Sequence, residues 1–174
     1  TLGSDDSTYA HHMKDARFTI PTPALLAKVV DLLDAVPMDN RDTKGDLYEY
    51  MLGKIASAGQ NGQFRTPRHI IQLMVELTAP TARDVICDPA CGTGGMLIST
   101  AAEVKRKGNE WRGLRLYGQE LNFGTAAIAR MNLFLHGVTD CHIAHGDTLA
   151  RPAFLNSDGA LNTFDLVLAN PPYS

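Results

Sequence analysis

The spacing of apolar residues predicts helices in the first part of the chain. Residues 23–36, PALLAKVVDLLDAV, repeat leucine and valine at three- and four-residue intervals, the period of an amphipathic helix. Residues 46–59, DLYEYMLGKIASAG, show the same period and end at Gly59, a residue type that commonly stops a helix. The turn-rich run 36–46 predicts a connector between these two helices.

A third helix is expected over residues 67–79, PRHIIQLMVELTA. Thr66 is its predicted N-cap, and Pro67 suits the first helical position because an N–H there has no partner within the helix. Its apolar face is predicted to consist of Ile70, Leu73, Met74 and Leu77. The segment ahead of it, AGQNGQFRTP, contains glycines, amides, an aromatic residue and an arginine, a composition that a simple connector between two helices does not need.

From residue 84 the pattern changes to short apolar runs separated by amphipathic stretches. The apolar runs cover residues 84–90, 114–120, 141–147 and 164–172. Amphipathic stretches lie between the first three runs, at residues 96–108 and 124–137. Strands that alternate with helices indicate an α/β fold with a parallel, doubly wound sheet.

These patterns divide the chain into three regions. Residues 1–20 are polar and aperiodic and are expected to form a loose N-terminus without a secretory signal. Residues 21–60 are expected to form a helical region, and residues 61–174 an α/β domain.

Composition excludes several classes of protein. No apolar run approaches the roughly 18 to 20 residues of a membrane helix, so we expect no membrane association. The net charge of −3 argues mildly against a stand-alone nucleic-acid binder, so a nucleic-acid substrate would need positive surface from elsewhere. Cys87, Cys91 and Cys141 lack zinc-site spacing, and His142 and His145 fall on opposite faces of a strand. We expect reduced thiols, no metal and a cytoplasmic protein.

The first predicted strand runs into a glycine-rich turn, DPACGTGGM, at residues 88–96. Gly92, Gly94 and Gly95 permit a tight turn and the close approach of a ligand, and the helix behind them offers free N–H groups. The third glycine directly follows the second, which departs from the G-x-G-x-x-G fingerprint of dinucleotide sites. Asp88 would sit badly beside a pyrophosphate, so the turn suits a ligand with positive charge.

Acidic residues follow the next two predicted strands. Glu120 comes after the glycine-rich turn at about the spacing at which an acid accepts hydrogen bonds from ribose hydroxyls. Asp147 is placed to accept a hydrogen bond from an adenine amine, but a helix cap or a solvated turn explains it equally well. Open α/β sheets bind ligands at the carboxyl edge, where both acids are expected.

The fourth predicted strand ends in NPPYS, residues 170–174. Pro171 and Pro172 fix the backbone and lack N–H donors, which leaves carbonyl oxygens on a rigid loop. Asn170 adds an amide and Tyr173 a flat ring. Together these groups can accept hydrogen bonds from a planar –NH2 group and stack on its ring.

With these motifs, the chain resembles S-adenosylmethionine-dependent DNA amino-methyltransferases, and more narrowly the modification subunit of type I restriction–modification systems. That family carries D-P-A-x-G-T-x-G after the first strand and N-P-P-[YF] after the fourth, found here at residues 88–95 and 170–173. It also carries G-Q-[FY]-x-T-P before the first strand, found here at residues 62–67. This order of motifs resembles the class that methylates adenine N6, on a Rossmann-like sheet.

The resemblance implies a role for each matching residue. The residues that would hold S-adenosylmethionine are Gln63, Phe64, Arg65, Thr66, Pro67, Arg68, Asp88, Gly92, Thr93, Gly94, Gly95, Glu120 and Asp147. Phe64 would face the sulfonium in a cation–π arrangement. The catalytic loop would be Asn170, Pro171, Pro172 and Tyr173, with Asn170 and the Pro171 carbonyl accepting from the adenine amine and Tyr173 stacking on the flipped base.

The resemblance also implies partners and an extent. DNA would be the substrate, read by a separate specificity subunit in a complex that also holds a restriction subunit. The family continues beyond the catalytic loop, so we expect an incomplete sheet whose last strand is an unpaired edge. We accordingly expect weak cofactor binding and no unaided methylation of DNA.

Other functions stay open at this point. A protein-glutamine N5 methyltransferase shares the N-P-P-Y loop because its target is also a planar amide nitrogen, although the segment at residues 62–64 argues against it. A fused restriction–methylation enzyme differs only in its flanks. A catalytically silent cofactor-binding or assembly module is the alternative from another class.

Overall fold

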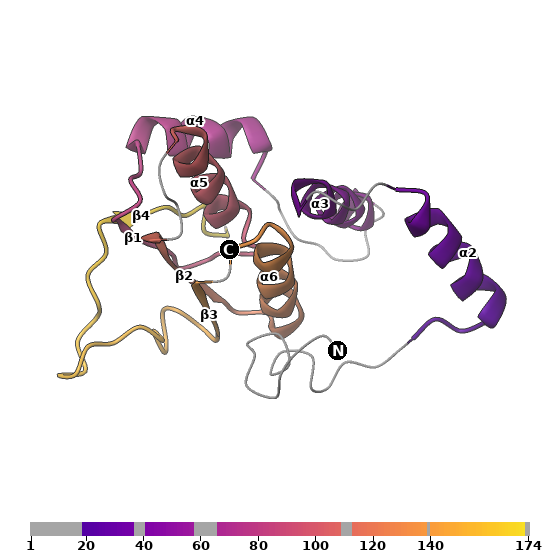
Figure 1. The fold of residues 1–174 in the computed structure, drawn as a ribbon. Helices are drawn as coiled ribbons and strands as arrows, with labels where there is room; N and C mark the ends of the chain where they lie inside the picture. The colour runs from indigo at the N-terminus through magenta and orange to yellow at the C-terminus, as the bar shows by residue number, and fades with distance from the viewer. Residues whose placement is uncertain (1–18, 37–40, 58–65, 109–112, 139, 173–174) are drawn as a thin grey trace.

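The computed structural model describes residues 19–36, 41–57, 66–108, 113–138 and 140–172. Its elements in chain order are α2 (Pro23–Asp34), α3 (Arg41–Ser57), α4 (Arg68–Thr78), β1 (Val85–Asp88), α5 (Gly95–Arg106), β2 (Arg115–Glu120), α6 (Phe123–Leu135), β3 (Cys141–His145) and β4 (Leu166–Val167). Strands and helices alternate from β1 to β3, as the sequence predicts (Figure 1).

The strands form one parallel sheet in the order β3-β2-β1-β4. In the central strand β1, Cys87 lies opposite Tyr117 of β2 on one side and opposite Val167 of β4 on the other. The chain moves outward from β1 to β3 and then returns to the far side of β1, and ligands of open α/β sheets bind at such a reversal. The predicted Rossmann-like α/β fold is confirmed.

One face of the sheet carries the main core. Helix α5 packs on β1, α6 packs on β2 and β3, and α4 packs on α5 (Figure 1). Leu97 and Val104 of α5, Leu116 of β2 and Leu133 of α6 are fully buried between these layers. Their burial anchors α5 and α6, so the turns that precede both helices start from fixed positions.

The connection between β3 and β4 packs on the opposite face of β2. Side chains alternate along a strand, so Tyr117 points away from the helices, and its ring lies 5.1 Å from Phe154 and 5.4 Å from Phe164 between centroids. Buried Gln119 holds the same connection with both ends of its amide: Nε2 donates to Arg151 O (3.0 Å) and Oε1 accepts from Ala153 N (2.9 Å). These contacts guide the chain back to β4.

Helix α3 begins earlier than the sequence predicts. Residues 41–46, expected in the connector, are helical because α3 packs against α6 at Gly45. A Cβ at Gly45 would lie 2.5 Å from Nε2 of His136, at the C-terminus of α6. A glycine that looks like a helix breaker in the sequence therefore permits the close approach of two helices.

Alanine at Gly45 is expected to destabilise the protein by about 1–3 kcal/mol, because the new methyl group overlaps the imidazole of His136. Alanine at Gly53 of the same helix is the matched control, since its Cβ would meet no atom of the described part of the chain within 4 Å. That change is expected to stabilise by about 0.5–1 kcal/mol through helix propensity alone. Urea denaturation of both variants measures the contrast, and equal stabilisation by both would contradict the packing described.

Two predictions for α4 are wrong. Pro67, not Thr66, is the N-cap, and Arg68 is the first helical residue. The buried positions are Ile71 and Val75, whereas Leu73 and Leu77 are exposed. Apolar residues occur around much of this helix, so its periodicity alone does not determine which face packs on α5.

Helix α2 starts behind Thr22, whose Oγ1 accepts a hydrogen bond from Leu25 N (3.3 Å). It confirms the helix predicted at residues 23–36, two residues shorter at its end, and none of its residues is buried against the rest of the described chain. Among the described ranges, no helix combines the length and apolar character needed to cross a bilayer.

Candidate functional site

The glycine-rich turn connects β1 to α5 at the carboxyl edge of the sheet. Its backbone is closed by hydrogen bonds from Cys91 N to Gln119 O (3.0 Å) and from Gly94 N to Cys91 O (2.8 Å). Gly92 and Gly94 have φ angles of 55° and 82°, a region that disfavours residues with a Cβ. The turn therefore needs glycine at both positions, and α5 begins directly behind it at Gly95.

Glu120 ties the end of β2 to this turn. Its Oε2 accepts a hydrogen bond from Gly92 N (3.1 Å), and its Oε1 accepts one from Asn122 N (2.9 Å). These two bonds orient the carboxylate between the glycine-rich turn and the start of α6. Each oxygen has a second lone pair, so the group can still accept hydrogen bonds from a ligand.

Asp88 is the last residue of β1, and it is almost completely excluded from solvent. It is 2% exposed, and its Oδ1 accepts a hydrogen bond from Ala90 N (3.1 Å). Burial raises the pKa of Asp88 to about 7, the charge of Glu120 adds to the rise, and the Ala90 N–H opposes it. Both protonation states of this carboxyl are therefore accessible near neutral pH, and a nearby positive charge would favour the ionised one.

Asn170 brings the end of β4 into contact with the segment that precedes α4. Its Nδ2 donates a hydrogen bond to Oγ1 of Thr66 (2.9 Å). The hydroxyl that the sequence assigns to a helix cap thus contacts a residue of the Asn-Pro-Pro loop instead.

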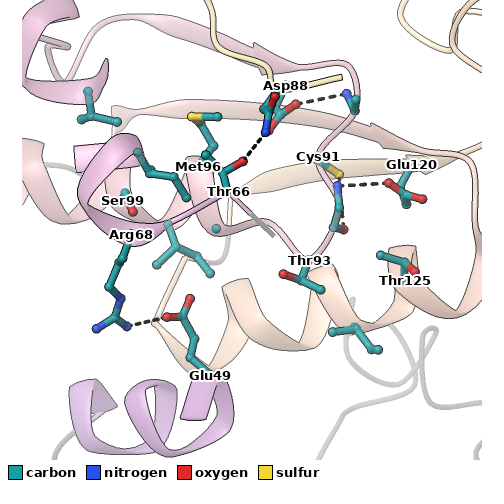
Figure 2. Close-up of a pocket in the computed structure, with 18 of the residues that line it drawn as sticks. Glu49, Thr66, Arg68, Asp88, Cys91, Thr93, Met96, Ser99, Glu120 and Thr125 are labelled. Atoms are coloured by element: carbon teal, nitrogen blue, oxygen red, sulfur yellow. Dashed lines mark hydrogen bonds and ion pairs between the residues drawn. The ribbon is translucent and has the colours of Figure 1, made fainter. Parts of the chain in front are cut away.

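One cavity joins these groups. It is lined by Thr66, Asp88, Gly92, Glu120 and Asn170, among others. In Figure 2, dashed lines join Glu120 to the glycine-rich turn and, at the opposite end of the cavity, Arg68 to Glu49. Asp88, Glu120 and Asp147 contribute carboxylates to the lining, whereas the Asp46 and Glu49 carboxylates are paired with Arg68, so the end of the cavity at the carboxyl edge of the sheet is the part that favours a cationic ligand.

The family model for N-6 DNA methylases matches residues 39–174. The chain belongs to the N-6 DNA methylase family. It is 33% identical to the type I restriction enzyme StySPI methylase subunit of Salmonella potsdam, over 99% of this chain and 36% of the relative. The EcoKI methylase subunit of Escherichia coli K12 is 32% identical over the same shares.

Solved structures of N-6 DNA methylases agree with this assignment. The type I restriction–modification methyltransferase subunit of Streptococcus thermophilus superposes with a TM-score of 0.72 at 29% identity, over 87% of this chain and 32% of that one. The chain thus spans about a third of the length of the relatives that it matches. The family match supports the DNA methylase hypothesis over the protein-glutamine alternative.

The remaining residues predicted for the cofactor site and for the catalytic loop are placed unevenly in this member of the N-6 DNA methylase family. Gln63, Phe64, Arg65 and Tyr173 lie outside the described residues. Pro67 and Thr93 line the cavity, as do Gly95, Pro171 and Pro172, whereas Gly94 is buried behind the turn. Arg68 also lines it, but its guanidinium forms ion pairs with Glu49 and Asp46 (3.5 Å to the latter) and so links α4 to α3.

Asp147 has one of the roles that the sequence leaves open. Its Oδ1 accepts hydrogen bonds from Leu149 N (2.9 Å) and Ala150 N (3.1 Å), which closes the turn after β3. The residue also lines the cavity beside Thr148 and Leu149. The turn-closing role is observed, and adenine binding stays a prediction.

The sequence predictions miss two residues that hold the turn in place. Asn132 of α6 is fully buried, and its Nδ2 donates to Thr93 O (3.0 Å). Thr148 donates from Oγ1 to Pro89 O (2.6 Å). A signal existed for Asn132, because it lies beside Leu133 and three residues after Ala129 on the buried face of α6, where a polar side chain requires a partner.

The cysteines match their predicted role. Cys87, Cys91 and Cys141 are free thiols, and Cys87 and Cys91 are buried. Burial raises the pKa of Cys87 and of Cys141 to about 11, so neither forms a thiolate at neutral pH.

Proposed function

We propose that this chain forms the cofactor-binding and target-binding part of a DNA methyltransferase that acts on adenine N6. In this proposal residues 61–174 are the methyltransferase domain and residues 21–60 a helical region before it. The observation that carries it is the shared cavity, in which the Asn170 amide of the Asn-Pro-Pro loop lies with Asp88, Glu120 and the glycine-rich turn. The chemistry needs a cofactor site and a target-amine site side by side.

S-adenosylmethionine is the proposed cofactor, and the residues present fit it. The cofactor is cationic at its sulfonium and its ammonium group, and the cavity is lined with carboxylates. A Cβ at Gly92, which lines the cavity, would meet no atom of the described residues within 4 Å, so this part of the structure leaves space beside the backbone of the turn. Glu120 would accept from the ribose hydroxyls, and Asp88 would face positive charge.

The cofactor, when bound, supplies an electrophilic methyl group. The chain would contribute position and hydrogen bonding. Asn170 Oδ1 and the Pro171 carbonyl would accept the two hydrogens of the adenine amine, which concentrates the nitrogen lone pair toward the methyl group. Tyr173 would stack on the extruded base. The nitrogen would bond to the methyl carbon as the carbon–sulfur bond breaks and a neutral thioether is left. The cationic amine so formed would then release one proton to water. This arrangement requires no strong general base, because the acceptors raise the lone-pair character of the nitrogen before the bond forms.

The type I names of the relatives support a proposal about partners. We infer that DNA is held mainly by a specificity subunit, and that a restriction subunit joins the same complex in the cytoplasm. The net charge of −3 and the acidic cavity supply little attraction for phosphates, so positive surface must come from another part of the assembly.

Calorimetric titration of S-adenosylmethionine into the complete gene product tests the cofactor site, with NAD as the control ligand. Glu120→Ala removes the ribose acceptor and is expected to weaken binding about 30-fold, the equivalent of roughly 2 kcal/mol for lost charged hydrogen bonds. Glu120→Gln keeps one acceptor oxygen, so its affinity for S-adenosylmethionine is expected to lie between those of the wild type and of Glu120→Ala.

Transfer of tritiated methyl groups to unmethylated genomic DNA tests the reaction, with digestion to nucleosides to identify the methylated base. N6-methyladenine is the expected product. Binding of NAD in preference to S-adenosylmethionine, or methylation of protein glutamine instead of DNA, would reject the proposal.

A further inference from the structure

Thr66 connects the two halves of the site. Its Oγ1 accepts from Nδ2 of Asn170 at 2.9 Å, although the two residues are far apart in the sequence. Thr66, Asn170 and Asp88 line the same cavity, and the dashed line from the Thr66 hydroxyl in Figure 2 marks its hydrogen bond with Asn170. One hydroxyl therefore lies where the proposed cofactor site and the proposed target site meet.

In the structure, Thr66 engages the Nδ2 end of the Asn170 amide. With Nδ2 engaged by Thr66, Oδ1 is left as the acceptor for a target amine. The flipped amide would present an –NH2 group to the –NH2 of adenine, and two donors cannot satisfy each other. A hydroxyl that accepts from Asn170 also keeps its own proton, which it can donate to another group in the cavity.

Both partners of this bond are anchored in the core. Thr66 directly precedes Pro67, whose carbonyl accepts from Ile70 N (2.9 Å) and Ile71 N (3.1 Å) in the first turn of α4. On the other side, buried Leu168 lies two residues before Asn170 and donates its N–H to Cys87 O of β1 (3.0 Å). The contact therefore joins two anchored segments and can hold an orientation.

We propose that Thr66 is a positioning residue for Asn170, which holds its amide with Oδ1 toward the target amine. This inference rests on the proposed function, in which Asn170 accepts from adenine N6. It adds to the cofactor role expected of Thr66 a second role, in the orientation of the group that binds the substrate.

Thr66→Val preserves the shape of the side chain and removes the hydroxyl, and Thr66→Ser preserves the hydroxyl. In the complete gene product assembled with its specificity subunit, at saturating S-adenosylmethionine and genomic DNA, Thr66→Val is expected to lower kcat about tenfold, as for the loss of one orienting hydrogen bond. Thr66→Ser is expected to retain kcat within about threefold. Saturating cofactor removes any separate effect of Thr66 on cofactor affinity.

An Asn170→Ala background distinguishes positioning from a general structural role. There, Thr66→Val is expected to cause no further loss of kcat, because the amide that it orients is gone. An equal loss in both backgrounds, or an unchanged kcat in Thr66→Val alone, would overturn the inference.

A second measurement decides the contact without catalysis. The side-chain amide protons of Asn170, observed by NMR, are expected to exchange with water faster in Thr66→Val than in Thr66→Ser. Unchanged exchange would overturn the Thr66 inference. A wild-type protein that methylates no DNA while Thr66→Val accelerates exchange would instead reject the proposed function and leave the contact established.

Discussion

Replacement of Asn170 by alanine is expected to lower kcat for adenine methylation about 100-fold, a loss typical of removing one hydrogen-bonding group aimed at charge that develops in the transition state. The amine gains positive charge as it attacks the methyl group, and an acceptor oxygen stabilises that charge. Because Asn170 is proposed to contact the target amine and not the cofactor, affinity for S-adenosylmethionine is expected to stay within about threefold. Single-turnover transfer of tritiated methyl groups measures the effect.

Two variants control this experiment. Asn170→Asp keeps an acceptor oxygen and is expected to retain about a tenth of the wild-type kcat. Asn162→Ala changes the same residue type on the connection between β3 and β4, outside the lining of the cavity, and is expected to leave kcat unchanged. If Asn170→Ala lost as much cofactor affinity as kcat, Asn170 would act in cofactor binding and not on the target amine.

The affinity for S-adenosylmethionine is expected to rise with pH up to about 7 and then to level off, because the pKa of Asp88 in the ligand-free protein is about 7. If the bound cation requires the ionised carboxylate, affinity falls about tenfold per pH unit below that value. Asp88→Asn is expected to remove this pH dependence and to weaken binding on the order of 100-fold at pH 8, as for a buried charge that has lost its partner. Calorimetric titrations of the wild-type protein and of Asp88→Asn from pH 5.5 to about 8.5 test both expectations.

The same carboxyl makes the stability of the ligand-free protein depend on pH. The pKa of Asp88 lies well above its ordinary value of 3.8, so between about 4 and 7 the folded chain binds a proton that the unfolded chain has lost. The free energy of unfolding therefore falls as pH rises across that window and is flat above it. Urea denaturation should show this slope in the wild type but not in Asp88→Asn, and an equal slope in both would assign it to another group.

Much of the α/β part was predictable because its signals are local. Each strand is a short apolar run, and the Asp-Pro and glycine residues around Gly92 and Gly94 mark where β1 must turn into α5. Glu120 was found in the same way, as an acid at a strand end. Its hydrogen bond to Gly92 N is a consequence of the parallel order that the alternation of elements implies.

The errors arise at positions whose structure depends on packing between segments that are far apart in the sequence. In the sequence Gly45 suggests the end of a helix, but in the structure it lies within α3 and allows His136 to approach. The buried face of α4 is determined by the position of α5. Thr66 has the sequence signature of an N-cap, yet its hydroxyl contacts Asn170. No local pattern encodes a hydrogen bond between residues so far apart in the chain.

The strands on the two sides of the site pair with their neighbours over different lengths. β2 pairs with β3 from Leu116 to Glu120, whereas β4 pairs with β1 at Leu166 and Val167. A strand with a short ladder opens at a lower free-energy cost than a strand with a long one. The backbone hydrogen bond from Leu168 N to Cys87 O continues the attachment of β4 toward Asn170. The orientation of the Asn170 amide therefore depends on few backbone hydrogen bonds and on its contact with Thr66, so the loss of any one of them is expected to disturb this part of the cavity before the part around Glu120.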